Sequence, residues 1–104
     1  MGWPIARDKY SLARQRITDG LWRVDPSAGK VFGARGQEIG YKTAEYVRIA
    51  IDDGGRTRDL MRGRVIWETV NGRIPDDLEV GHRGDRGDDA VENLLLVSRR
   101  RAAS

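Results

Sequence analysis

The sequence predicts an α+β domain in which antiparallel β-hairpins precede a helix and two further short strands. Short apolar runs of strand type alternate with turn residues from residue 21 to residue 61. Residues 62–70 then have helical character. This helix stops at Asn71-Gly72, and Pro75 prevents it from resuming. Short apolar runs at residues 78–80 and 94–97 predict the last two strands.

The beginning of the chain reads as a leader that ends in a short helix. Four apolar residues fall roughly on one face of such a helix: Ile5, Leu12, Ala13 and Ile17. Asp19-Gly20 ends it, because glycine tolerates the left-handed conformation at a helix C-terminus. We therefore divide the chain into residues 1–19, the leader and short helix, and residues 20–104, the main domain.

Two hairpins are predicted between this helix and residue 61. The first joins residues 21–24 to residues 30–32 across a turn that contains Asp, Pro and Gly. The second joins residues 46–51, the best strand of the chain, to residues 56–61 across a Gly-Gly turn. The glycines of residues 33–40 predict a loop between the two hairpins.

Composition narrows the possible classes of function. A chain of 104 residues suits one small domain, and 38% hydrophobic with 34% charged residues suits neither a disordered chain nor a membrane protein. No apolar run approaches the roughly 20 residues of a membrane-spanning helix. We expect no membrane partner and, from the polar character of residues 1–10, no secretion signal.

The chain has no cysteine and one histidine, His82. Disulfides, thiolate zinc sites and Cys/His zinc fingers are therefore excluded, and a reducing compartment such as the cytoplasm fits. The net charge is +3 and the pI about 9.7, mostly from arginine. Arginine suits contacts to phosphate and guanine, although a genome with GC-rich codons explains its abundance equally well.

An ordered set of short motifs fills the C-terminal part of the chain. It consists of R-V-I-W-E-T-V-N-G-R-I-P at residues 64–75, V-G-H at 80–82, G-D at 84–85 and E-N-L-L-L-V at 92–97. In this order and spacing the set resembles the HNH homing endonucleases of phages and group I introns. The hairpins before it also resemble the segment that precedes the HNH core, so the resemblance covers about residues 20–101.

The resemblance implies a ββα-metal-like HNH core with a truncated final helix, and hydrolysis of DNA phosphodiesters with Mg²⁺ or Mn²⁺. His82 matches the position of the general base. Asn93 matches the central asparagine, which fixes the loop and the histidine by hydrogen bonds. Arginines near the core are the candidate phosphate contacts: Arg62, Arg64, Arg99, Arg100 and Arg101.

Three positions depart from the family's pattern. The metal ligand before the base is Gly81 here, and the last ligand position falls at Ala102. The family's usual histidine before Arg64 is Gly63. Because neither Gly nor Ala has a side chain that can hold a metal, the resemblance predicts a degenerate active site with no certain cofactor.

The leading interpretation is a phage protein of the HNH superfamily that binds double-stranded DNA in the cytoplasm of an infected bacterium, with nuclease activity weakened or lost. In a first alternative, an active Mg²⁺- or Mn²⁺-dependent endonuclease uses acidic loop residues as substitute ligands: Asp85, Asp88, Asp89 and Glu92. These acids also read as a solvated loop. In a second alternative, the scaffold binds a host protein through an exposed patch near Trp3 or Trp22.

Overall fold

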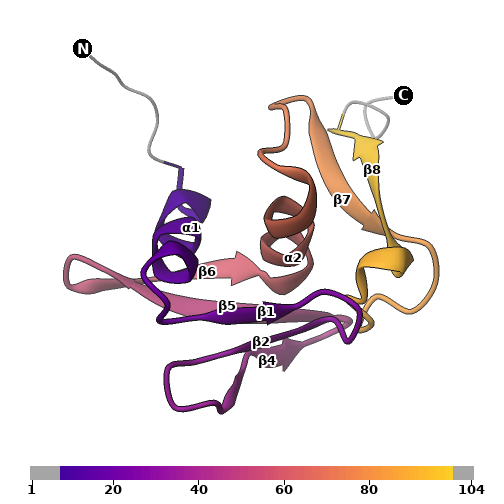
Figure 1. Ribbon diagram of the computed structural model, residues 1–104. Helices are drawn as coiled ribbons and strands as arrows, with labels where there is room; N and C mark the ends of the chain where they lie inside the picture. The colour runs from indigo at the N-terminus through magenta and orange to yellow at the C-terminus, as the bar shows by residue number, and fades with distance from the viewer. Residues whose placement is uncertain (1–7, 100–104) are drawn as a thin grey trace.

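The computed structural model describes residues 8–99, which form two helices, one 3-10 turn and eight strands (Figure 1). The helices are α1 (Tyr10–Thr18) and α2 (Arg62–Asn71), and the 3-10 turn is η1 (Val91–Asn93). The strands are β1 (Arg23–Asp25), β2 (Lys30–Phe32), β3 (Glu38–Ile39), β4 (Tyr41–Thr43), β5 (Tyr46–Asp53), β6 (Arg56–Met61), β7 (Leu78–His82) and β8 (Leu94–Ser98). The predicted α+β class is confirmed.

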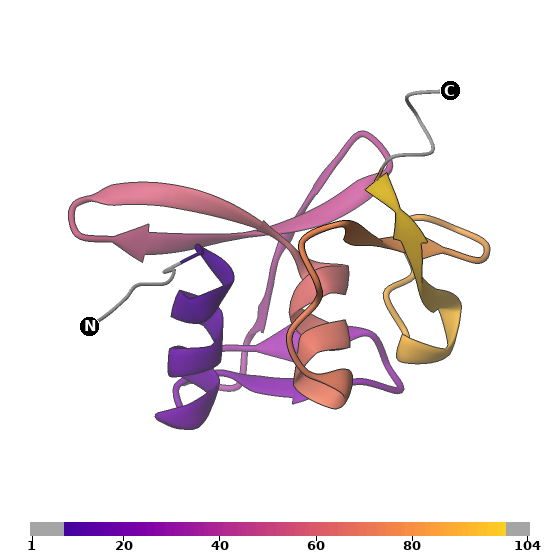
Figure 2. The ribbon, with the colours of Figure 1, turned by 90° about the horizontal axis from the view of Figure 1, so that it is seen from above.

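The strands form three antiparallel sheets, with the orders β1-β2-β3, β4-β5-β6 and β7-β8. Both predicted hairpins are present, as β1–β2 and β5–β6. The β5–β6 hairpin extends past α1 and ends at the predicted Gly-Gly turn (Figure 2). Both predicted late strands are also present, and they pair with each other as β7–β8.

The expected loop at residues 33–40 is partly wrong. Glu38 and Ile39 form β3 on the edge of β2, and β4 begins two residues later on the edge of β5. Gly40, with φ of +131°, turns the chain between these two strands. Strands this short are stabilised by pairing with neighbouring strands, so the glycine-rich local sequence does not reveal them.

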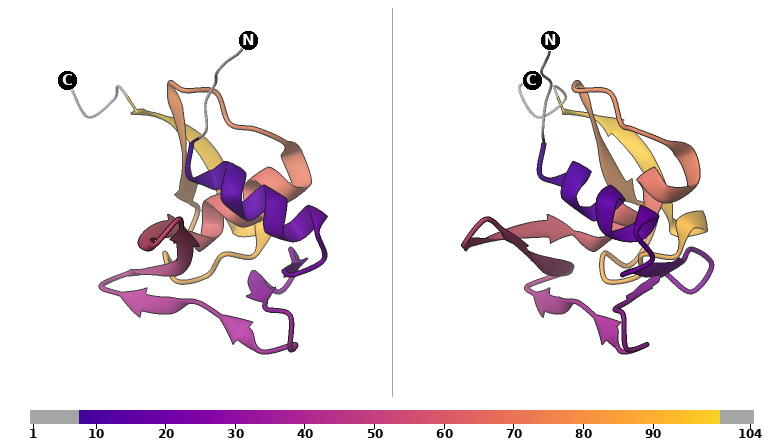
Figure 3. Two further views of the ribbon diagram at one scale, coloured as in Figure 1. Left: turned by 90° about the vertical axis from the view of Figure 1, so that its left-hand side faces the viewer. Right: turned by 60° about the vertical axis from the view of Figure 1, so that its left-hand side comes forward.

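One core joins the two helices to all three sheets. Its buried side chains are Tyr10, Ala13, Trp22, Val31, Ile49, Ile51, Leu60, Val65, Ile66 and Leu94. Helix α2 lies in the middle, between α1 and the β7–β8 hairpin, and it contacts β1, β2, β5 and β6 (Figures 1 and 3). Helix α1 packs into this core through Tyr10 and Ala13 and is therefore an integral part of the folded unit.

Helix α2 begins directly after β6 and ends at Gly72, whose φ of +92° breaks the helical path. Its buried face carries Val65 and Ile66. Glu68 is also buried, and it is paired with Arg14 of α1 and Arg64 of its own helix, so its charge is compensated. These pairs hold α2 against α1 and fix the side chain of Arg64, which lies in the first turn of α2.

The exposed patch considered for a host protein included Trp3 or Trp22. Trp22 is only 8% exposed and belongs to the core, so it does not form the exposed patch considered for a host protein. Trp3 and the truncated final helix lie outside the described residues. None of the helices within residues 8–99 combines the length and the apolar character needed to cross a membrane.

Candidate functional site

His82 is the last residue of β7 and its ring is held inside the fold. The side chain is 4% exposed, and Nε2 lies 2.7 Å from Oδ1 of Asp89. The ring of Tyr46 on β5 lies beside it, with the ring centroids 5.8 Å apart. His82 is therefore positioned by contacts with a loop that follows it and with a strand that precedes it.

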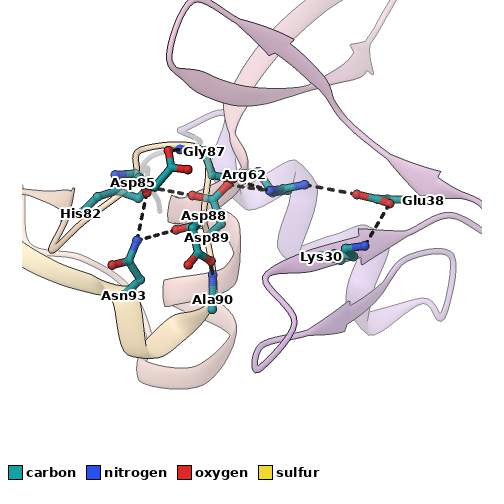
Figure 4. A network of polar contacts seen from close by, with 10 residues as sticks. All are labelled: Lys30, Glu38, Arg62, His82, Asp85, Gly87, Asp88, Asp89, Ala90 and Asn93. Carbon is teal, nitrogen blue, oxygen red and sulfur yellow. Dashed lines mark hydrogen bonds and ion pairs between the residues drawn. The ribbon is translucent and has the colours of Figure 1, made fainter.

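Asp89 connects His82 to Arg62 (Figure 4). The carboxylate is 2% exposed, and its second oxygen, Oδ2, accepts a hydrogen bond of 2.8 Å from Nε of Arg62. Arg62 also donates to the carbonyl of Gly87 at 3.2 Å and pairs with Glu38 at 3.4 Å. Each carboxylate oxygen thus has its own partner, as a buried charge requires.

Two glycines, Gly63 and Gly29, leave the space that Asp89 occupies. A Cβ at Gly63 would lie 2.8 Å from Oδ1 of Asp89, so any larger residue there would displace the carboxylate. Gly29, with φ of +70° in the β1–β2 turn, lies against the backbone of Asp89 and Ala90, with no room for a Cβ. The first hairpin therefore supports the loop that carries Asp89.

Asn93 fixes the loop between β7 and β8. Its Oδ1 accepts from the N–H of Gly84 at 2.9 Å, and its Nδ2 donates to the carbonyls of Asp85 and Asp88 at 3.0 and 2.8 Å. It lies in η1, directly before β8, and not on the strand itself. Within residues 8–99 no hydrogen bond joins Asn93 to His82, whose direct partner is Asp89.

The acidic residues of the loop do not gather into a metal site. Asp85 accepts from the N–H of Gly87, and Asp88 accepts from the N–H of Ala90. Gly81 offers no donor, and a Cβ there would meet the side chain of Val97 at 3.2 Å. No group of three or more His, Asp and Glu side chains in the described part of the chain is arranged to hold a metal ion, so these residues do not fit one.

A cavity of about 500 Å³ opens beside His82. Among the described residues, four basic side chains and one acidic side chain, that of Glu79, line this cavity. The basic residues are Lys9, Arg64, Arg86 and Arg99. The rings of Tyr10 and Tyr46 form part of its wall. The cavity is therefore a cationic site with aromatic walls, next to the only imidazole of the chain.

The cavity arginines are held without being fully neutralised. Nε of Arg64 donates to Glu68 at 2.9 Å, and its guanidinium lies 4.3 Å from the ring centroid of Tyr10. Arg86 is half exposed and pairs with Glu45 at 2.7 Å. Arg99 donates to the carbonyl of Leu78. An exposed ion pair such as that of Arg86 contributes little to stability, so its guanidinium remains available to a ligand.

Burial raises the pKa of the Tyr10 hydroxyl, and the hydrogen bond from the N–H of Met61 opposes this effect. The phenol therefore stays neutral over the physiological pH range, and Tyr10 contributes a hydroxyl and a ring to the cavity wall without adding negative charge.

Comparison with known proteins agrees with this architecture. Residues 62–104 match a family model described as HNH endonuclease, which includes α2, β7, η1 and β8. The resemblance to the HNH endonucleases is confirmed. No protein with a curated description matches the chain.

A solved structure described as "DNA binding and cleavage by the HNH homing endonuclease I-HmuI" is also similar. The match has a TM-score of 0.61 and 20% sequence identity, and it covers 81% of this chain and 50% of that chain. At this identity the likeness shows the fold. The chain spans half the length of that HNH homing endonuclease.

The site residues of the HNH segment, residues 62–104, fall into two groups. His82, Arg64 and Arg99 line the cavity, whereas Arg62 is buried in the pair with Asp89. Arg100, Arg101 and Ala102 lie outside the described residues. Asp89 was considered as a metal ligand or as part of a solvated loop, whereas its carboxylate is 2% exposed. Its pairing with His82 was missed, because nothing in the local sequence distinguishes Asp89 from Asp88.

Proposed function

We propose that this protein binds double-stranded DNA with the cationic cavity beside His82, and that its nuclease activity is weakened or lost. The observation that carries the proposal is the cavity itself, which four basic side chains and one acidic side chain of the described residues line together with His82. Clustered arginines and lysines are the groups that hold the phosphate backbone of nucleic acids. The HNH match of residues 62–104 supports DNA as the source of that phosphate.

The arginines divide by role under this proposal. Arg86 and Arg99 are exposed and would contact phosphates, with Arg64 deeper in the cavity. Arg62 is almost fully buried and would hold the loop instead of the DNA. Arg100 and Arg101 follow Arg99 in the sequence and remain candidate phosphate contacts. The host-protein alternative receives no comparable support, since Trp22 belongs to the core.

Replacing a cavity arginine is expected to weaken DNA binding and its salt dependence together. For Arg99→Ala we expect the slope of log K against log salt concentration to fall by about 1, because one phosphate contact and its released counterion are lost. Affinity for duplexes of different sequence should fall alike. Fluorescence anisotropy with a labelled duplex over a range of salt concentrations measures both quantities.

Arg56→Ala is the matched control, because Arg56 is exposed at the β5–β6 turn and does not line the cavity. It removes the same charge, and its effect should be small. Equal losses in the two variants would mean that only net charge matters. Unmeasurable binding of the unaltered protein, even at low salt, would contradict the proposal.

We expect no metal-dependent nicking of supercoiled plasmid that depends on His82. The unaltered protein and His82→Ala should give equal nicking with Mg²⁺ and with Mn²⁺, because the described side chains do not fit a metal ion. Nicking by the unaltered protein alone would establish a working endonuclease. Asp85→Ala and Asp88→Ala would then test the substitute ligands, and unchanged cleavage in both would reject them.

A further inference from the structure

The two ring nitrogens of His82 have different surroundings. Nε2 is directed at the buried carboxylate of Asp89. Nδ1 has no hydrogen-bond partner among residues 8–99, and the ring itself lines the cationic cavity. The ring therefore has one nitrogen bound to the protein and one free for a molecule that enters the cavity.

The chemistry of the partners decides which nitrogen carries the hydrogen. Nε of Arg62 is always a donor, and it occupies Oδ2 of Asp89. A carboxylate only accepts hydrogen bonds, so the short contact at Oδ1 requires Nε2 of His82 to donate. A neutral imidazole with its hydrogen on Nε2 has its lone pair on Nδ1.

We propose that Asp89 is the positioning residue of His82. The chain of bonds from Arg62 through Asp89 keeps the neutral ring in the Nε2–H tautomer, with the Nδ1 lone pair available to the cationic cavity. There Nδ1 accepts a hydrogen bond from a water molecule beside a bound phosphate. The hydrogen bond to this water rests on the proposed DNA binding, whereas the tautomer of His82 does not.

Residues from distant parts of the chain hold the carboxylate of Asp89 in position. Gly63 leaves the space that Oδ1 occupies, and Gly29 lets the first hairpin approach the backbone of Asp89. The N–H of Val91 donates to the carbonyl of Pro26 and fixes the next turn of the loop. With Asn93 holding the other side, the carboxylate has little freedom to turn away from His82.

Asp89→Asn is expected to reverse the tautomer. An amide has one acceptor and one donor group, so it cannot accept from both Arg62 and His82. If its oxygen stays with the charged Arg62, its NH₂ faces His82, and Nε2 must then accept. The neutral ring is expected to change from the Nε2–H to the Nδ1–H form, the change of tautomer known to inactivate a histidine base in another enzyme class.

Long-range ¹H–¹⁵N NMR, at a pH where the ring is neutral, shows which ring nitrogen of His82 carries the hydrogen. His82 is the only histidine of the chain, so every imidazole signal belongs to it. The matched control is Asp88→Asn, which removes the same charge from the neighbouring residue; Asp88 caps the N–H of Ala90 and does not contact the ring. We expect the Nε2–H pattern in the unaltered protein and in Asp88→Asn, and the Nδ1–H pattern in Asp89→Asn.

An Nδ1–H pattern in the unaltered protein would overturn the proposal, and so would an unchanged pattern in folded Asp89→Asn. Backbone amide spectra establish whether each variant is folded. If Asp89→Asn does not fold, Gly63→Ala replaces it. Its Cβ displaces Oδ1 of Asp89, so the Nε2–H population should fall, and an unchanged population would count against the proposal. Duplex affinity, measured on the same samples, reports separately on the proposed function.

Discussion

Arg62→Ala is expected to lower the free energy of unfolding by about 3–5 kcal/mol. Arg62 is the only cation paired with the buried carboxylate of Asp89 among the described residues, and it also binds the carbonyl of Gly87. Its loss leaves a buried charge with His82 as its remaining partner. Urea unfolding followed by tryptophan fluorescence measures the effect, since Trp22 lies in the core.

Arg58→Ala is the control for this experiment. Arg58 also pairs with an aspartate, Asp53, at 3.0 Å, but about a third of each side chain is exposed. Its loss should cost less than about 1 kcal/mol, because solvent screens the pair. Similar losses in Arg58→Ala and Arg62→Ala would show that the buried network does not determine stability.

Gly29→Ala is expected to lower the free energy of unfolding by about 2–5 kcal/mol. The φ of +70° at Gly29 costs an alanine about 1–2 kcal/mol, and its Cβ would collide with the backbone of Asp89 and Ala90. The collision pushes the first hairpin away from the loop that holds His82. Thermal or urea unfolding measures the loss, and the single imidazole signal of His82 should shift as well.

Gly36→Ala separates the two causes of this effect. Gly36 has a similar φ, +82°, but a Cβ there would meet no atom within 4 Å. Only the backbone cost of about 1–2 kcal/mol should remain, with no change at His82. If Gly29→Ala were no worse than Gly36→Ala, the close approach of the hairpin to the loop would not be important.

The order and type of the main helices and strands follow from local sequence signals. Helix α2 was predicted at residues 62–70 and found at Arg62–Asn71, because Asn71-Gly72 and Pro75 are local stop signals. The β5–β6 hairpin was predicted for a similar reason, since its Gly-Gly turn is specified by adjacent residues. The ordered motifs also singled out His82 and Asn93, through the resemblance to the HNH endonucleases.

The surroundings of the site residues depend instead on how distant segments pack together. Arg62 reads as a DNA contact from its charge, yet it is buried against Asp89, 27 residues away in the sequence. Gly63 reads as a missing histidine, yet it provides the space that Asp89 fills. The cavity brings Lys9 and Arg99 to one site from the two ends of the described chain. Burial and pairing depend on which distant segments pack together, and no local periodicity or motif encodes that arrangement.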